Sequence, residues 1–418
     1  MKDVWSMRLN RLRLVLAIAA IALSFPNVAW PSPRFGGPDA VENQLEEDEQ
    51  EKQPLLELDF LQRYRDWKAK VREKTGIHFG GDYSAQAFFA HQSAGDDHAG
   101  SGMYRFFGTW DLVDRGGDHP GAFVWKVEHR HRYTDVPPSD FGFETGYVGL
   151  VGPPFSDQGW RTTNLYWRQR FAKGRFSVIA GFLDATDYVD AYALASPWLH
   201  FANLAFSTGS ASIALPNDAM LGIAAAGMLT ESLYAIAGLG DANGDPKAPF
   251  DGFESFFEDH EFFTSFEIGW TRSHDRLLLD NVHLTFWHVD ERDAAGTPSG
   301  WGMNLSASLY VRDHWLPFLR AGWAKDGGSL LDRSVSAGIG YQAVPGRDLL
   351  GVAVNWGRPN RDTFGPGRDD QWALEIFYRW QVLREIAVTP SVQLLIDPAL
   401  NPDESAIWVF GLRFRYAL

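Results

Sequence analysis

The chain has 418 residues, no cysteine and a formal net charge of -15. The absence of cysteine excludes a disulfide framework, a cysteine-ligated zinc site and the lipid-anchor cysteine of a bacterial lipoprotein. The acidic balance argues against nucleic acid as a partner. No linker divides the chain after its N-terminal region, which favours one large closed sheet over two or three soluble domains.

Residues 1–29 have the three parts of a secretory signal peptide. An apolar run spans 12–25, small residues end at Ala29, and the basic residues that open the segment are Lys2, Arg8, Arg11 and Arg13. The run is shorter than the roughly 20 residues of a spanning helix, so we predict a cleaved signal peptide rather than a membrane anchor. After it, no stretch of 18 apolar residues occurs, which excludes helical membrane spans.

Residues 30–76 divide into two parts. Residues 30–54 are rich in proline, glycine and acids, with an acidic run at 46–51, and this composition predicts a flexible tail that buries no core. From 55 to 74, apolar and basic residues recur at helical spacing, and Gly76 follows as a stop signal. We expect one short amphipathic helix on the periplasmic side of a β-barrel, or tucked into its mouth.

From residue 77 to 418 the hydrophobic period is two. In the last strand, one row is Trp408, Phe410, Leu412, Phe414, Tyr416 and Leu418, and the other row is Val409, Gly411, Arg413, Arg415 and Ala417. Alternation of this length, with aromatic residues at both ends, is typical of transmembrane β-strands that face lipid on one side and a wet lumen on the other. We therefore predict an all-β transmembrane barrel over residues 77–418.

Sixteen such segments can be counted, an even number in the size range that leaves an aqueous channel. Segment 134–157 is either another strand or an inserted loop hairpin. The predicted strands are 77–91, 102–114, 120–133, 158–172, 174–184, 218–229, 231–241, 260–272, 277–290, 300–311, 314–325, 330–343, 347–358, 370–382, 385–397 and 404–418.

The predicted connections alternate in length. Tight turns, such as those at 172–174 and 383–385, suit periplasmic hairpins. The long polar connections should face outside, and they are 185–217, 242–259, 291–299, 359–369 and 397–403.

Three local patterns, in order along the chain, resemble one family. They are Trp67, Arg72, Gly76, Ile77, His78, Phe79 and Tyr83 at the start of the first strand, the strand end and loop at 181–190, and the closing hairpin with 389–393, 396–398 and 410–413. Together they resemble the carbohydrate-selective porin family (OprB type), known from glucose uptake across Gram-negative outer membranes. The resemblance implies a cell outer-membrane pore for facilitated diffusion of monosaccharides such as glucose, without a cofactor. It covers essentially the whole mature chain.

The chain end departs from that pattern. The family and most such barrels end in an aromatic residue that the barrel-assembly machinery recognises, whereas this chain ends in Leu418, with Tyr416 as the nearest aromatic residue on the outward row. We still expect insertion through the C-terminal strand.

Candidate pore-constriction residues follow from the alternation. If Phe123, Trp125 and Val127 face lipid, the inward row of that strand is Lys126, Glu128, Arg130 and Arg132, and neighbouring strands add Arg105, Arg168 and Arg170. Guanidinium groups present fixed donors to sugar hydroxyls and repel small cations, and flat aromatic rings suit the C–H faces of a sugar. The alternative is that these charges merely solvate the lumen and pair across strands. We predict a constriction of Arg105, Glu128, Arg130 and Arg168, with Trp198 or Trp160 if a loop folds inward.

Other residue patterns carry less chemistry. Asp241, Asn243 and Asp245 have part of a calcium-loop spacing, but a plain turn is favoured. His129 and His131 share a strand face without a third ligand, so we predict no metal site. No hydrolase elbow, Walker loop or zinc-protease motif occurs, so we predict no enzyme.

Two alternative functions stay open, namely a general or ion-selective porin and a barrel-embedded outer-membrane hydrolase. The expected partners are small neutral sugars, outer-membrane lipid and the assembly machinery, with no nucleic acid. The sequence leaves open whether the barrel is a monomer or a homotrimer.

Overall fold

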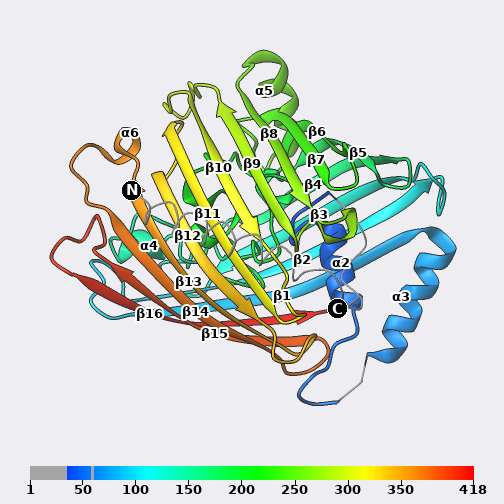
Figure 1. Cartoon of the computed structure of the whole chain (residues 1–418), viewed down its shortest axis with the longest axis horizontal. Helices are drawn as coiled ribbons and strands as arrows, with labels where there is room; N and C mark the ends of the chain where they lie inside the picture. Colours follow the sequence, from blue (N-terminus) through cyan, green and yellow to red (C-terminus); the bar gives the residue numbers. More distant parts are fainter. Residues whose placement is uncertain (1–34, 58–60) are drawn as a thin grey trace, which may run out of the picture.

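The computed structural model describes residues 35–57 and 61–418. Its strands form one closed antiparallel barrel in which each strand pairs with its sequence neighbours and β1 pairs with β16 (Figure 1). The predicted sixteen-stranded barrel is confirmed. The strands are β1 (Ile77–Ala90), β2 (His98–Val113), β3 (Gly121–Arg132), β4 (Gly159–Phe171), β5 (Phe176–Leu183), β6 (Met220–Met228), β7 (Leu233–Asp241), β8 (Phe262–Thr271), β9 (Asn281–Val289), β10 (Gly300–Ser308), β11 (Trp315–Asp326), β12 (Leu331–Tyr341), β13 (Asp348–Pro359), β14 (Gln371–Gln381), β15 (Ile386–Ile396) and β16 (Ala406–Ala417).

The two faces of the barrel wall differ as the alternation predicts. In β16, Trp408, Phe410 and Leu412 are exposed on the outside, whereas Val409 and Arg413 are buried on the inside. Because successive side chains of a strand point to opposite faces, one row meets the outer surroundings and the other row lines the lumen. The wall is therefore apolar on its outer side.

Arginine placed on the outer face tests whether this face meets hydrocarbon. Leu319 lies mid-strand in β11 and is 54% exposed, while Val311 lies beside the turn before that strand. We expect Leu319→Arg to lower the free energy of unfolding by about 2 to 4 kcal/mol and Val311→Arg by about 0 to 1 kcal/mol. Urea unfolding in lipid bilayers measures both, and equal losses would contradict a lipid-facing outer row.

The two ends of the barrel carry different connections. At one end, here called the turn end, short connections such as 172–175 join the strands. The first strand, β1, begins at this end and the last strand, β16, ends there. The opposite end, the loop end, carries α4 (Phe141–Glu144), α5 (Gly252–Glu258) and α6 (Arg361–Phe364). The described segment 134–157, which the sequence left open, contains α4 and no strand.

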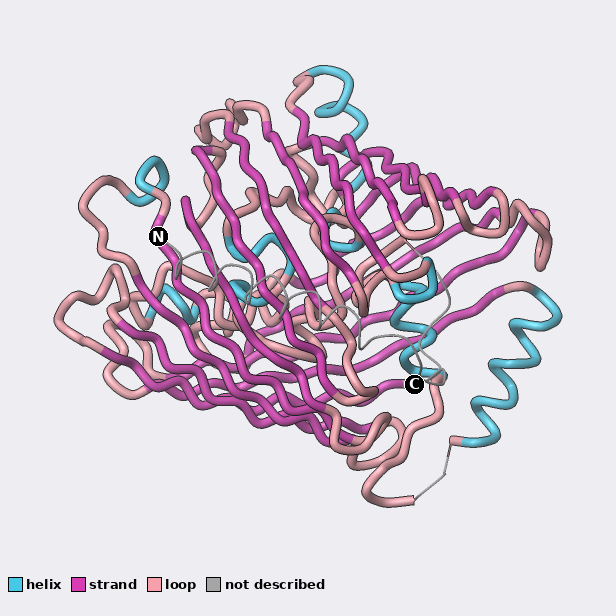
Figure 2. The backbone as a smooth tube through the Cα atoms, in the orientation of Figure 1, coloured by secondary structure: helices cyan, strands magenta, loops and turns pink. Residues whose placement is uncertain are grey.

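The longest of the predicted outside connections lies inside the barrel instead. Residues 185–217 were expected to face outside, but residues 184–219, here called the inward loop, fold into the lumen (Figure 2). The cause is an apolar surface on the loop. The Phe201 ring lies 4.8 Å from the Phe377 ring and Tyr192 lies 5.2 Å from Phe318, measured between ring centroids. These aromatic side chains of the loop therefore pack against the barrel wall instead of being exposed to solvent.

The N-terminal segment also differs from expectation. Residues 30–54 were predicted to be flexible and to bury no core, but within them α2 (Val41–Glu49) lies inside the barrel, with Val41 and Leu45 buried (Figure 1). Basic side chains of the barrel wall pair with the acidic side chains of α2. The acidic composition of this segment is therefore compatible with a place inside the barrel. The predicted signal peptide, residues 1–29, lies outside the described residues and stays a prediction.

The second N-terminal helix, α3 (Gln62–Thr75), lies outside the wall at the turn end (Figure 1). It ends where Gly76 adopts a left-handed conformation with φ of 76°, as the stop signal predicts. Its Trp67 ring lies 5.8 Å from the Phe79 ring on the outer face of β1, and Lys68 Nζ donates to Leu418 O at 2.9 Å. Among the described residues, no helix combines the length and apolar character needed to cross a membrane.

Candidate functional site

The candidate site begins with Arg105 on the inward row of β2. Asp82, its register partner on β1, accepts a hydrogen bond from Arg105 Nε at 2.9 Å and another from Arg415 Nε at 2.7 Å. One carboxylate thus orients two guanidinium groups, each held by charge-assisted hydrogen bonds.

Trp198 of the inward loop completes this part of the lumen. The Arg105 Cζ lies 5.0 Å from the centroid of the Trp198 ring, and Trp198 is 8% exposed. At this distance the guanidinium is attracted by the π-electrons of the ring. An aromatic ring and a group with several hydrogen-bond donors therefore lie in contact, with the guanidinium over one face of the ring.

Two further predicted residues lie next to them on β3. Glu128 is the register partner of Arg105. Arg130 Nη2 lies 2.7 Å from Glu128 Oε2 and 3.7 Å from an oxygen of Asp218. Both side chains are buried inside the barrel, so this wall carries charges of both signs.

Lys126, on the same inward row, faces a group of acids. Its Nζ lies 3.8 Å from Asp184 Oδ2 and 3.7 Å from Asp187 Oδ1 in the inward loop. Nearby, Asp39 of the N-terminal segment accepts a hydrogen bond from Ser196 Oγ at 2.6 Å. Burial raises the pKa of Asp39, an effect that the Ser196 hydrogen bond and the charges of Arg105 and Lys126 oppose.

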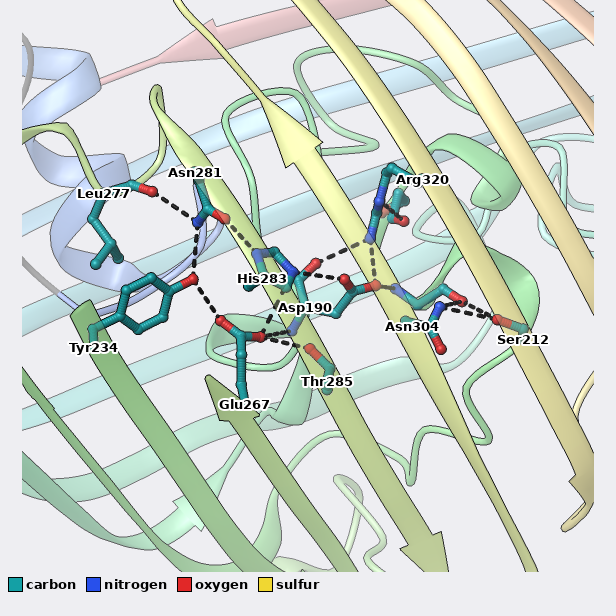
Figure 3. Close-up of polar contacts among 12 residues, drawn as sticks. Asp190, Ser212, Tyr234, Glu267, Leu277, Asn281, His283, Thr285, Asn304 and Arg320 are labelled. Carbon is teal, nitrogen blue, oxygen red and sulfur yellow. Dashed lines mark hydrogen bonds and ion pairs between the residues drawn. The ribbon is translucent and has the colours of Figure 1, made fainter. Parts of the chain in front are cut away.

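The inward loop is fixed to the wall through Asp190 (Figure 3). Asp190 Oδ1 lies 2.8 Å from His283 Nε2 on β9, and Arg320 of β11 forms an ion pair with Asp190 and donates to its carbonyl oxygen at 3.1 Å. Asp190 Oδ2 also accepts from Gly209 N at 2.8 Å, while Glu267 Oε2 accepts from Asp190 N at 3.0 Å. One buried aspartate thus joins three strands, β8, β9 and β11, and two parts of the loop.

A second attachment lies on β14 and β16. Glu375 accepts hydrogen bonds from the backbone nitrogens of Ala202 and Asn203 at 2.7 and 2.9 Å. Arg413 donates to the carbonyl oxygens of Pro197 and His200, both at 2.6 Å. These contacts hold the stretch of loop that carries Trp198.

The structure separates the five predicted constriction residues into two places. Arg105, Glu128, Arg130 and Trp198 lie around the inward loop, whereas Arg168 lies at the turn end and pairs with Glu42 of α2. Their role in solute passage stays a prediction. Sequence reasoning missed Asp82, although the alternation of β1 places it inward, because register against Arg105 cannot be read from one strand.

The remaining candidates lie elsewhere. Trp160 is 69% exposed on the outer face, where its ring lies 4.9 Å from that of His129. His129 and His131 share this outer face, and the described residues hold no group of three potential metal ligands. Asp241 accepts from Asn243 N at 3.0 Å, the contact of a plain turn.

A closed sixteen-stranded barrel with an apolar outer face and a charged lumen crossed by an inward loop defines a porin. The sequence model described as "Carbohydrate-selective porin, OprB family" matches residues 57–418. The chain therefore belongs to the carbohydrate-selective porin OprB family.

Solved structures share the fold. The high-pH structure of Pseudomonas putida OprB is 16% identical, with a TM-score of 0.66 over 85% of this chain and 97% of that one. A mutant of the Rh. blastica porin is 13% identical, with a TM-score of 0.51 over 82% of this chain and 100% of that one. A search of curated proteins found no match.

Proposed function

We propose that this protein is an outer-membrane porin that passes monosaccharides such as glucose by facilitated diffusion. Membership of the OprB family supports the substrate class. The observation that carries the proposal is the Arg105 guanidinium against the Trp198 ring, because it brings N–H donors for sugar hydroxyls and an aromatic ring for sugar stacking to one place. The turn end faces the periplasm in this proposal, as short connections do in outer-membrane barrels.

The surroundings expected for such a pore are part of the proposal. The outer face meets outer-membrane lipid, the C-terminal strand is the signal for the assembly machinery, and the barrel acts as a monomer or a homotrimer. No catalytic step or cofactor is needed, because solute moves down its own gradient.

Liposome swelling tests the substrate class. Proteoliposomes should swell faster in glucose than in an amino acid of similar size, because the site offers both a donor array and a stacking face. Equal rates would favour a general diffusion porin, and hydrolysis of added esters or lipids would favour the barrel-embedded hydrolase.

Removing Arg130 tests the constriction. Arg130→Ala should change the glucose swelling rate or the single-channel conductance by about twofold or more, because the Glu128 charge then stands in the lumen without its nearest partner. The heat-resistant mobility of the folded barrel should stay unchanged. Arg132→Ala is the matched control, since Arg132 lies on the same inward row of β3 but is exposed. Unchanged flux in Arg130→Ala would count against the constriction.

A further inference from the structure

The acidic helix α2 occupies the turn-end half of the lumen. Its Glu42 forms ion pairs with Arg168 and, at 2.6 Å, with Arg170, both on β4. These arginines precede the short connection at 172–175, which places this end of the helix near the turn end.

The other end of α2 is bound in the same way. Asp48 Oδ1 and Oδ2 accept hydrogen bonds from Arg415 Nη1 and Nη2 at 2.7 and 2.9 Å, respectively, which makes a bidentate carboxylate–guanidinium ion pair. Glu47 lies 3.4 Å from Arg379 on β14. The helix is thus paired with basic residues on opposite parts of the wall, β4 and β14–β16.

The last acid of the helix contacts the first strand. Glu49 Oε1 lies 2.8 Å from His78 Nε2 on β1 and Glu49 Oε2 lies 3.0 Å from Arg72 Nη1 on α3. Burial works to raise the pKa of Glu49, but the His78 hydrogen bond and the nearby positive charges outweigh it and lower that pKa. Glu49 therefore stays ionised and adds to the electrostatic attachment.

Charge rather than apolar packing dominates the attachment of α2. The helix has nine residues, of which Val41 and Leu45 are its buried apolar side chains. Cavities of about 390 and 720 Å³ lie on two sides of it: Asn43 and Glu47 line the first, Asp48 and Glu49 the second. Val41 and Leu45 join a hydrophobic cluster with wall residues such as Phe107, so two side chains supply the apolar packing that would remain once the ion pairs are broken.

The matched family region begins at residue 57, so α2 lies outside it. If α2 leaves, Arg168, Arg170, Arg379 and Arg415 lose the carboxylates of Glu42, Glu47 and Asp48. Wall carboxylates remain beside two of them, Asp82 beside Arg415 and Asp111 beside Arg168. The acids of α2 show that carboxylate groups fit these positions. The uncovered wall is therefore an anion-binding surface inside the pore.

We propose that α2 is a tethered acidic plug seated on an anion-binding site, so that the pore opens when α2 leaves and then favours anionic solutes such as sugar acids. The proposal rests on the proposed pore function. It extends that function, because the solutes selected by the open state carry a carboxylate.

A reversible crosslink tests whether the plug moves. A Cβ built on Gly37 would lie 3.2 Å from Ala191 Cβ in the inward loop. This is a few tenths of an ångström below the roughly 3.5–4.5 Å of a disulfide, so a small shift of the segment allows the bond, and the chain has no cysteine of its own. Downstream, Gln53 N and Leu55 N donate to Gly346 O and Gln381 O, which holds the other side of α2 at the rim. The double variant Gly37→Cys, Ala191→Cys should conduct poorly when oxidised and several-fold better after a reducing agent. The two single-cysteine variants should not respond to reductant. Equal conductance of the oxidised and reduced double variant in planar bilayers would overturn the proposal.

Removing the plug charges tests the anion site. Glu42→Gln with Asp48→Asn should raise the open-channel frequency and shift the reversal potential in a KCl gradient toward anion selectivity. Glu51→Gln with Glu57→Gln removes the same charge from exposed positions just after α2 and should shift neither. With glucuronate as the probe, its flux relative to glucose should rise in the first variant and stay constant in the second. Identical behaviour of the two double variants would refute the anion site.

The two proposals fail in different ways. If glucose flux persists but neither crosslink nor charge removal alters conductance, the plug is refuted and the sugar pore stands. If glucose never passes but the reductant still opens the channel and the reversal potential shifts, the plug stands and the sugar pore fails.

Discussion

Replacement of Asp190 by alanine is expected to release the inward loop, raising single-channel conductance several-fold and lowering the free energy of unfolding by about 3 to 5 kcal/mol. Asp190 is fully buried and pairs with Arg320, which is also buried, and with His283. Without the carboxylate, the buried Arg320 loses its ion-pair partner, His283 loses the Asp190 contact at Nε2, and Gly209 N loses its acceptor. The loop then loses its carboxylate contacts to β9 and β11 and keeps the weaker hydrogen bonds from Arg320 to the carbonyl oxygens of Asp190 and Ser207 on that side.

Conductance in planar bilayers and urea unfolding in detergent measure the two effects. Asp259→Ala removes an exposed aspartate at the loop end and should change neither. Arg320→Met combined with Asp190→Ala should cost less than the sum of the single changes, because the partners act as one unit. Wild-type conductance in Asp190→Ala would show that the other contacts of the loop, including those of Glu375, Arg413 and Lys126, are enough to hold it.

Replacement of Trp198 by alanine is expected to weaken glucose binding in the pore about tenfold, the size expected for losing ~1.4 kcal/mol of contact. The change removes the aromatic face beside Arg105 and leaves the Asp82 ion pair in place. Glucose-dependent current noise gives the binding constant, and ion conductance should rise because the lumen widens.

Two variants separate stacking from volume. Trp198→Phe keeps an aromatic ring and should stay close to wild type. Trp160→Ala removes a tryptophan from the outer face and should leave glucose binding unchanged. A Trp198→Ala protein with wild-type glucose affinity would remove Trp198 from the recognition site.

The wall of the barrel was predictable because its signal is local. Trp408 and Val409 are both apolar but differ in exposure, because successive side chains of a strand point to opposite faces, and this alternation recurs from strand to strand. Strand ends shifted by only a few residues, since turns and alternation mark them independently. The inward placement of Arg105, Glu128 and Arg130 follows from the same period of two.

The contents of the lumen were not predictable, because their partners are distant in sequence. An acidic run such as 46–51 suggests solvation outside the barrel when judged alone, and its place inside the lumen depends on Arg379 and Arg415 at the far end of the chain. The course of the inward loop likewise depends on Asp190 meeting Arg320 and His283. Neither set of ion pairs produces a periodic pattern in the sequence from which it could be predicted.

The barrel is closed where β1 pairs with β16, and this pair of strands is here called the seam. Leu418 N donates to Gly81 O at 2.8 Å, and Ala417 stands opposite Asp82. Until this seam forms, an inserting chain has two open edges, each a row of unpaired backbone groups that hydrocarbon cannot satisfy. Closure must therefore wait until β16 is available to pair with β1, and a chain that lacks this strand keeps two open edges in the membrane.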